Sequence, residues 1–375
     1  MSARHVPTTV GFGWNFLVSA DANTDKGAAS DVKAGERPPI SWKKRLLFRS
    51  VLLLFMLVMA ELGLSLYSHF FYPRLTVTDP VLGWRYKATE EPIERRDERD
   101  GEVTVNRIEI NSLGFRDEEF STDPKVVKVM ALGDSMTFGL EADQDEVFSL
   151  KLEGLLRESL PDNEVDVLNF GITGFSTTQE FVCLEEYEPV YRPDAVVLTM
   201  LELNDFEDNA TVFNNRFVPH FERKADGELE LKTEPTGLHR FKNVLRDNST
   251  LYYVLASKIG FVRRALTERM DLDRDGRTRL TLDVVRRIAA YTRERDLPLH
   301  VYYACLLDWA SDRRDAMTAL SKELGFSFEI IPLVPPERVG GSGHWNGHGH
   351  AETAKKMHAR LMADQAFLAR AKAKR

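Results

Sequence analysis

The stretch VVKVMALGDSMTFG, residues Val126 to Gly139, decides the fold that we expect for this chain. Its first half is an apolar run typical of a buried strand, and its second half is a Gly-Asp-Ser turn. In a parallel α/β sheet, a serine directly after the first strand lies at the carboxyl edge, where such sheets bind ligands. Ser135 is therefore a candidate nucleophile, although a role as a helix N-cap explains this residue equally well when it is taken by itself.

Apolar runs and amphipathic stretches alternate along the rest of the chain. Strands are predicted for Val126–Leu132, Val165–Leu168, Ala195–Met200, Leu299–Cys305 and Phe326–Ile331, and helices for Val147–Leu160, Thr177–Tyr187, Asp312–Leu324 and Glu352–Leu368. This alternation predicts an α/β domain over residues 126–372, a three-layer α/β/α sandwich with a central parallel sheet. An insertion at about residues 209–280 interrupts the pattern and should cover the ligand edge. Within it, Phe217–Leu231 predicts a hairpin that turns at Asp226-Gly227.

Two further loops and one histidine are expected at the same edge as Ser135. Gly174 lies in the loop after the second strand, and Asn204 follows the third strand. A glycine amide of the first loop, the side-chain amide of Asn204 and the backbone amide of Ser135 can converge there on one oxyanion. The sequence HWNGHGH, residues 344–350, precedes the last helix and can bring a histidine imidazole to the same edge as a base.

These four segments, in this order and spacing, resemble the sequence blocks of the SGNH (GDSL-like) hydrolase family over about residues 126–368. The resemblance implies a flavodoxin-like strand order, Ser135 as the nucleophile, His344 as the base, and Gly174 and Asn204 as oxyanion-hole residues. It also implies a serine esterase that cleaves an ester, for example an O-acetyl ester, without a metal or a cofactor. The apolar amino-terminal segment resembles that of membrane-anchored bacterial members.

The acid that completes the family's triad is missing from its usual place. Members carry it two or three residues before the catalytic histidine, where this chain has Ser342 and Gly341. An acid from elsewhere could orient the imidazole, and Glu337 and Asp308 are the nearest candidates in the sequence. A backbone carbonyl could take the same role in a Ser-His dyad, so the identity of the partner of His344 stays open.

Two alternatives to an esterase follow from the same residues. The site could move an acetyl group onto a cell-surface polysaccharide, because acyl transfer and ester hydrolysis share the nucleophile, the base and the oxyanion hole. The missing acid also allows a catalytically decayed binding protein that keeps the fold. The sequence does not separate these functions, nor does it identify the ester or O-acylated substrate.

The amino-terminal segment predicts a membrane anchor. Residues 1–44 form a polar leader that ends in a basic cluster, and residues 45–71 form an apolar run long enough to cross a bilayer. Glu61 is the costly residue in this run, at about 1–3 kcal/mol unless it is protonated or paired. Because basic flanks stay in the cytoplasm, we expect a single-pass signal anchor in the cytoplasmic (inner) membrane with the catalytic domain outside.

A signal peptide cleaved after Ala60 is the alternative to this anchor, although the leader is much longer than the usual amino-terminal region of such peptides. After the anchor, residues 73–125 show no regular pattern, and we interpret them as an irregular lead-in that packs on the surface of the domain, whereas the leader before the anchor is expected to be disordered. The motif Asn111-x-x-Gly-Phe-Arg, residues 111–116, stands out among its charges.

Charge and metal-ligand patterns exclude several classes of partner. The net charge of −8 comes from mixed-sign clusters without a basic stripe, so nucleic acid is not expected as a partner. Cys183 and Cys305 are interpreted as two buried thiols. His344, His348 and His350 lack the further ligands of a zinc site. The acidic sequence at residues 271–276 resembles the start of a calcium loop but is better explained as a helix-capping loop.

Overall fold

The computed structural model describes residues 41–71, 74–89, 93–99, 102–213, 216–224, 227–258, 267–270, 272–306, 311–334 and 343–375. Contacts divide the chain into two units, residues 1–55 and 56–375. From Trp42 onward, the described residues of the first unit are helical and belong to α1 (Trp42–Phe71). Most of the predicted leader, residues 1–40, lies outside the described residues.

Helix α1 matches the predicted apolar segment. It has 30 residues with a mean hydropathy of 2.1 over its most apolar window, and none of that window is buried. By length and composition it can cross a membrane. Its apolar side chains form no single stripe, which is the pattern of a helix that is surrounded by apolar material rather than laid on a protein core.

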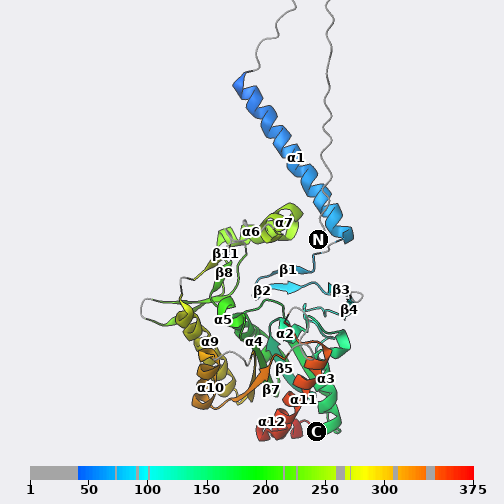
Figure 1. Ribbon diagram of the computed structural model, residues 1–375, viewed down its shortest axis with the longest axis vertical. Helices are drawn as coiled ribbons and strands as arrows, with labels where there is room; N and C mark the ends of the chain where they lie inside the picture. The colour runs from blue at the N-terminus through cyan, green and yellow to red at the C-terminus, as the bar shows by residue number, and fades with distance from the viewer. Residues whose placement is uncertain are drawn as a thin grey trace, which may run out of the picture. The chain divides into compact units, whose positions relative to one another are not determined.

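The central sheet contains five parallel strands, as predicted. These are β5 (Val127–Gly133), β6 (Val165–Gly171), β7 (Ala195–Leu201), β12 (Leu299–Cys305) and β13 (Ser327–Pro332). Their order in the sheet is β13-β12-β7-β5-β6, which is the flavodoxin-like order 2-1-3-4-5 counted along the chain. Figure 1 labels β5 and β7 of this sheet. The carboxyl ends of β5, β6 and β7 are therefore neighbours at one edge.

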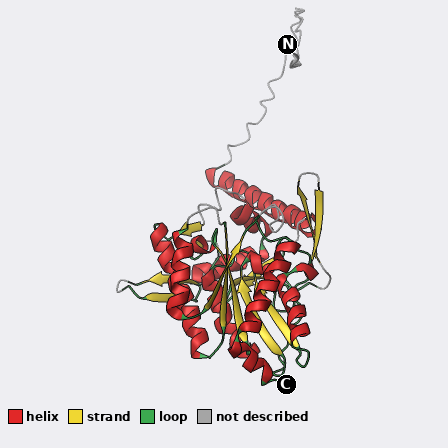
Figure 2. Ribbon diagram, turned by 60° about the horizontal axis from the view of Figure 1, so that its bottom comes forward, coloured by secondary structure: helices red, strands yellow, loops and turns green. Residues whose placement is uncertain are grey.

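Helices cover both faces of the sheet (Figure 2). One face packs against α4 (Thr177–Tyr191), α9 (Arg274–Glu294) and α10 (Asp312–Leu324), and the other against α3 (Phe148–Ser159), α11 (Gly347–Ala363) and α12 (Gln365–Lys372). Side chains alternate between the faces along each strand. Val129 of β5 accordingly joins one core and Met130 the other. Each buried apolar side chain stabilises the sandwich by about 1.5–3 kcal/mol.

The lead-in is more ordered than the sequence predicted, and it does not merely cover the surface. It contains two hairpins, β1 (Thr76–Asp79) with β2 (Gly83–Tyr86) and β3 (Ile93–Arg99) with β4 (Glu102–Ile108). The first turn forms because the Asp79 carboxylate accepts hydrogen bonds from the amides of Val81 and Leu82. Leu82, Trp84 and Phe115 are buried in the main core.

The carboxyl-terminal helix also differs from the prediction. The single predicted helix Glu352–Leu368 is two helices, because Asp364 ends α11 and its side chain caps the first amides of α12. Helix α11 begins earlier than predicted, at Gly347, because the Asn346 side chain accepts a hydrogen bond from the Gly349 amide 3.0 Å away. The short polar stretch before residue 352 is therefore a capped first turn.

The described residues of the insertion after β7 form a small sheet, a hairpin and two helices. Strand β8 (Thr211–Phe213) pairs with β11 (Thr267–Arg269), and β9 (His220–Arg223) pairs with β10 (Leu229–Lys232) in the predicted hairpin. The helices are α6 (Gly237–Asn248) and α7 (Thr250–Lys258). At the predicted turn Gly227 has a positive φ of 90°, whereas Asp226 lies outside the described residues.

Helix α9 begins at Arg274, inside the range predicted for the insertion. The Asp273 side chain accepts a hydrogen bond from the Gly276 amide, so the acidic sequence is a helix-capping loop as favoured above. Asp271, the first residue of that sequence, lies outside the described residues. Cys183 and Cys305 are buried free thiols, as predicted.

Candidate active site

The turn that carries Ser135 is fixed by its neighbours in the chain. Strand β5 ends at Gly133, and the four-residue helix α2 (Ser135–Phe138) follows at once. Asp134 is the N-cap, and its carboxylate accepts a hydrogen bond from the Met136 amide at 2.9 Å. The capping role that the sequence left open for Ser135 therefore falls to Asp134.

A second loop packs closely against this turn. A Cβ atom on Gly171 would lie 2.4 Å from the backbone nitrogen of Phe138, so only glycine fits at the end of β6. Next to it, the Asn169 side chain donates to the Thr137 carbonyl and accepts from the Gly171 amide. These contacts tie the carboxyl ends of β5 and β6 together and hold Ser135 in place.

Arg116 is the residue that the sequence analysis missed at this site. Its guanidinium donates to the carbonyls of Phe138, Gly139 and Ala142, and it is almost fully buried. Arg116 of the lead-in thus satisfies the backbone carbonyl groups at and just after the carboxyl end of α2. The Asn111-x-x-Gly-Phe-Arg motif was the available signal, because Asn111 turns the chain by accepting from the Phe115 amide.

The structure brings Ser135 and His344 together. The Ser135 hydroxyl oxygen lies 2.7 Å from Nε2 of His344, across 209 residues of sequence. At this distance the hydroxyl can donate its hydrogen bond to a neutral imidazole. The serine is buried and the histidine is partly exposed, so the pair lies at the rim of the sheet edge rather than inside the core.

Asn204 also lies in this site. It precedes α5 (Asp205–Asp208), and its Nδ2 donates to Oδ2 of Asp134 at 2.7 Å and to Oδ2 of Asp208 at 3.2 Å. The amide is therefore beside the Ser135 turn but occupied by carboxylates. To hold an oxyanion, Asn204 would have to exchange one of these partners for the substrate oxygen.

Gly174 lies in the loop after β6 and has a positive φ of 76°. That backbone conformation favours glycine, and nothing approaches its Cβ position closer than an atom of Trp84 at 3.8 Å. The loop begins at the carboxyl edge beside β5, which is the expected place for an oxyanion-hole amide. Its role in catalysis stays a prediction.

Glu180 and Asp205 are buried carboxyl groups near Asp134 and Asp208, the two residues to which Asn204 donates. Burial raises the pKa of Glu180 well above its ordinary value, and the neighbouring charges of Asp134 and Asp208 raise it further. Burial and the charges of Asp134 and Glu180 likewise raise the pKa of Asp205. Burial and mutual repulsion thus favour the protonated forms of Glu180 and Asp205, which limits the negative charge near the site.

His350 has a structural role. Its Nδ1 accepts a hydrogen bond from the Phe148 amide at 3.2 Å, and its ring stacks on the Phe148 ring. Burial, with the nearby charges of Arg116 and His344, lowers the pKa of His350 to about 3, so the ring stays neutral. Within the described ranges, no group of three or more His, Cys, Asp or Glu side chains is arranged to hold a metal ion.

Both acid candidates lie outside the described residues. Asp308 belongs to the gap between residues 306 and 311, and Glu337 to the gap between 334 and 343. Ser342 and Gly341, which stand where the family's acid would be, fall in the same second gap. The partner that orients the His344 ring therefore stays a prediction with the three possibilities given above.

No family model and no curated protein matches this chain. Solved structures do match. The psychrotrophic esterase EstA from a Pseudoalteromonas species has 9% sequence identity over 63% of this chain and 97% of its own chain, with a TM-score of 0.36. The acetyl xylan esterase AlAXEase has 12% identity over 63% of this chain and 100% of its own (TM-score 0.37), and a putative lipolytic protein of the G-D-S-L family from Desulfitobacterium hafniense has 10% identity over 62% of this chain and 98% of its own (TM-score 0.34). Likenesses this low carry no argument about activity, which rests on the geometry of the site.

Proposed function

We propose that this chain is a membrane-anchored serine esterase of the SGNH (GDSL-like) type. The observation that carries the proposal is the distance of 2.7 Å between the Ser135 hydroxyl and Nε2 of His344, at the carboxyl edge of a flavodoxin-like sheet. A serine hydroxyl becomes a nucleophile when an adjacent base can take its proton. Ester bonds are the proposed target, with O-acyl groups as the class of substrate.

The first step is acylation. His344 takes the proton of Ser135 while the serine oxygen attacks the ester carbonyl, and a tetrahedral oxyanion forms. The protonated imidazole then gives its proton to the departing alcohol, which leaves an acyl group on Ser135. In the second step His344 takes a proton from water while the water oxygen attacks the acyl carbon, and a second tetrahedral oxyanion forms. Its collapse breaks the bond between the acyl carbon and the Ser135 oxygen, the protonated imidazole returns its proton to that oxygen, and the carboxylic acid leaves.

The oxyanion is assigned to three amides: the backbone amides of Ser135 and Gly174 and the side chain of Asn204. Support comes from Asn204, whose Nδ2 lies within hydrogen-bonding distance of Asp134, the residue next to the nucleophile. Removing one oxyanion-hole donor in a hydrolase costs about 2.7–4 kcal/mol of transition-state stabilisation. Loss of the Asn204 amide is therefore expected to lower turnover by about two to three orders of magnitude, which is less than the loss expected when the base is wrongly oriented.

The anchor is assigned to α1. This helix is long and apolar enough to span a bilayer, and Lys43, Lys44 and Arg45 precede its apolar run. The positive-inside rule then places the domain outside the cytoplasm, in the cytoplasmic membrane of the cell. The substrate would accordingly be an ester at the cell surface, for instance an O-acylated polysaccharide.

Hydrolysis of p-nitrophenyl acetate by the full chain in detergent tests the proposal. Ser135→Ala and His344→Gln should each lower kcat by at least about three orders of magnitude, since each removes the nucleophile or the base and leaves only the catalysis of the oxyanion hole and of substrate binding. Ser159→Ala is the matched control, because Ser159 also lies 2.8 Å from a histidine, His358, but between α3 and α11. Equal activity of Ser135→Ala and the wild type would refute the proposal.

A further inference from the structure

Two cavities adjoin where the second half of α1, the hairpin β1–β2 and α7 meet, all within residues 56–375. One has a volume of about 550 Å³ and the other of about 680 Å³. Ser68, Thr76, Thr250 and Tyr253 are among the residues that line both, so the cavities are adjacent. They differ in chemistry, because one is polar and basic and the other is mainly apolar.

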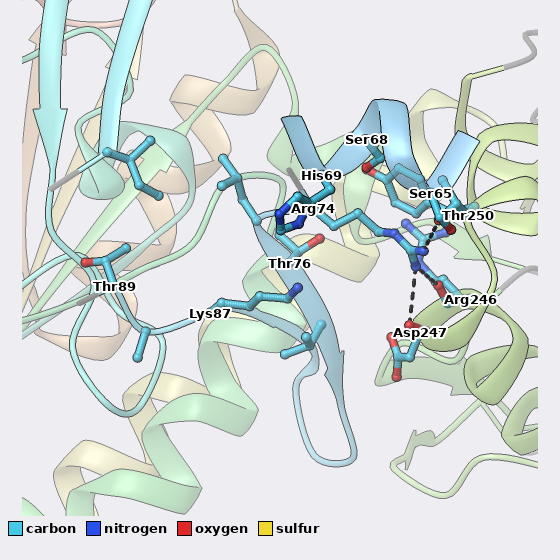
Figure 3. Close-up of a pocket in the computed structure, with 15 residues that line it drawn as sticks. Ser65, Ser68, His69, Arg74, Thr76, Lys87, Thr89, Arg246, Asp247 and Thr250 are labelled. Carbon is cyan, nitrogen blue, oxygen red and sulfur yellow. Dashed lines mark hydrogen bonds between the residues drawn. The ribbon is translucent and has the colours of Figure 1, made fainter. Parts of the chain in front are cut away.

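Basic side chains gather around the first cavity. Figure 3 shows His69, Arg74, Lys87 and Arg246 around one space. Among the described residues that line it, Asp247 is the sole carboxylate. The wall therefore carries a net positive charge and is complementary to an anion.

The two arginines of this cavity are held in place. Arg74 donates to the carbonyls of Arg246 and Asp247 and to the Thr250 hydroxyl. The guanidinium groups of Arg74 and Arg246 lie 5.4 and 5.2 Å from the centre of the Tyr253 ring. Burial lowers the pKa of Arg246, and the charge of Arg74 adds to this effect, so a bound anion would relieve the repulsion.

The second cavity is suited to a hydrocarbon chain. Its walls include Leu64, Tyr67 and Phe71 of α1, together with Ile108 and Val254. Of these, the α1 residues belong to the segment that the proposed anchor places in or beside the bilayer. A molecule that fills both cavities must have an anionic head and an apolar tail.

The neighbouring helix α6 presents apolar side chains to solvent. Leu238, Phe241 and Val244, three residues apart, are 61%, 60% and 58% exposed. Arg240 and Lys242 lie between them in the sequence. An amphipathic helix with apolar and basic residues of this kind is typical of a segment that lies in a membrane interface.

Hydrogen bonds to Glu61 of α1 join the start of α7 to the proposed anchor helix. The Glu61 carboxylate of α1 accepts hydrogen bonds from the Ser249 hydroxyl and from the amides of Thr250 and Leu251, the first residues of α7. A carboxylate is favourable at a helix amino terminus. If α1 crosses the bilayer, α7 and the cavities beside it lie at the surface of that bilayer.

We propose that the two cavities together bind a phospholipid of the surrounding membrane, with its anionic headgroup against Arg74, Lys87 and Arg246 and an acyl chain along α1. This inference rests on the anchor in the proposed function and is independent of the hydrolase chemistry. The bound lipid would fix the insertion, and with it the approach to the site, against the membrane surface.

Native mass spectrometry of the full chain in detergent tests the inference with dioctanoyl phosphatidylglycerol as the probe. The wild type should bind one molecule at least about ten-fold more tightly than dioctanoyl phosphatidylcholine, because only the former has a net negative headgroup. Lys87→Glu should lose this preference, whereas Lys125→Glu, an exposed lysine elsewhere, should keep it. Equal binding of the two lipids by the wild type would overturn the inference.

A second variant distinguishes a lipid from a free anion. Val254→Asp should weaken phosphatidylglycerol binding while its thermal unfolding remains close to that of the wild type, because the apolar cavity holds the acyl chain. Full competition by millimolar inorganic phosphate, with no effect of Val254→Asp, would show a simple anion site and contradict the proposal. A wild-type chain that is soluble without detergent would refute the anchor, whereas a membrane-bound chain without lipid preference would refute this site alone.

Discussion

Asn204 and Asp134 show how much of the site depends on single hydrogen bonds. The amide that we assign to the oxyanion donates to the carboxylate beside the nucleophile, at 2.7 Å. A substrate oxyanion must replace this contact or the contact with Asp208. The Asn204 amide is therefore held beside the Ser135 turn before substrate binds. The same carboxylate caps α2 through the Met136 amide. Asp134 thus positions both the proposed nucleophile and the proposed oxyanion donor.

The orientation of His344 gives a prediction at this scale. If a carboxylate holds the far nitrogen of the ring, replacing that residue by its amide should lower kcat by about four orders of magnitude, because the wrong tautomer cannot accept from Ser135. We expect Glu337→Gln to have this effect and Asp308→Asn to have little, with KM nearly unchanged in both. Steady-state kinetics on p-nitrophenyl acetate measures it. If both variants retain wild-type kcat, a backbone carbonyl or another group must orient the ring.

Glu180 gives a prediction about pH. Its pKa in the folded chain lies above the ordinary value of 4.5, so the folded state binds more protons than the unfolded state, and stability falls as the pH rises through the folded pKa. Glu180→Gln, which matches the shape of the protonated acid, should reduce this loss as the pH rises above the ordinary glutamate pKa of 4.5. Urea unfolding at several pH values measures it.

The control for this prediction is Glu323→Gln, an exposed glutamate whose replacement should leave the pH dependence as it is. Asp205 should retain part of the slope in the Glu180 variant, because burial raises its pKa in the same direction. An unchanged slope in Glu180→Gln would mean that Glu180 is ionised in the folded chain and that the interpretation of the carboxyl cluster is wrong.

At the scale of elements, Glu61 has a structural role, because it joins α1 to the start of α7. The sequence identified it as a costly carboxylate in an apolar run. In the structure it accepts three hydrogen bonds from the start of α7 and one from Ser65, which offset the cost of its charge. A carboxylate in α1 thereby joins the anchor to the insertion.

Glu61→Leu should therefore loosen α7 even though it makes α1 more apolar. Loss of the carboxylate removes the partners of the Thr250 and Leu251 amides, which we expect to cost about 1–2 kcal/mol locally. Hydrogen exchange of the full chain in detergent should show faster exchange over Thr250–Lys258 and unchanged exchange over β5. Equal protection of α7 in variant and wild type would contradict the capping role of Glu61.

The sequence predicted the regular elements of the domain more successfully than their surroundings. β12 and α10 have the predicted bounds, because their apolar and amphipathic patterns are long and their ends are marked by capping residues. The hairpins of the lead-in were missed because β1 and β2 have only four residues each and β3 consists mostly of charged residues. The strands of each hairpin also pair only with each other. Arg116 was missed because its partners are backbone carbonyls about 25 residues away, which leave no pattern in the sequence.

On the scale of the whole molecule, the fold places the proposed chemistry and the proposed anchor in one chain. The sheet sets Ser135, Gly174 and Asn204 on neighbouring loops, and the loop before α11 brings His344 to the same edge. These placements follow from strand order and were predictable from the order of the sequence blocks. The contacts of the insertion with α1 were not, because they join segments nearly 190 residues apart.

The orientation in the membrane gives a prediction at this scale. Alkaline phosphatase fused after Arg375 should be active, since that enzyme needs an oxidising compartment, and the intact chain should pellet with membranes after a carbonate wash. Green fluorescent protein at the same position serves as the reciprocal control and should be dark after export in unfolded form. A soluble mature chain that begins at Glu61 would instead show a cleaved signal peptide.

The reaction of Ser135 with a fluorophosphonate tests the central claim most directly. An activated serine attacks phosphorus and displaces fluoride, so the full chain should gain one phosphonyl group, which intact-mass analysis and peptide sequencing should place on Ser135. His344→Gln should be labelled far more slowly, and Ser159→Ala should be labelled like the wild type. Absence of labelling at Ser135, in a wild-type chain that unfolds cooperatively, would contradict the account of this site as a serine esterase.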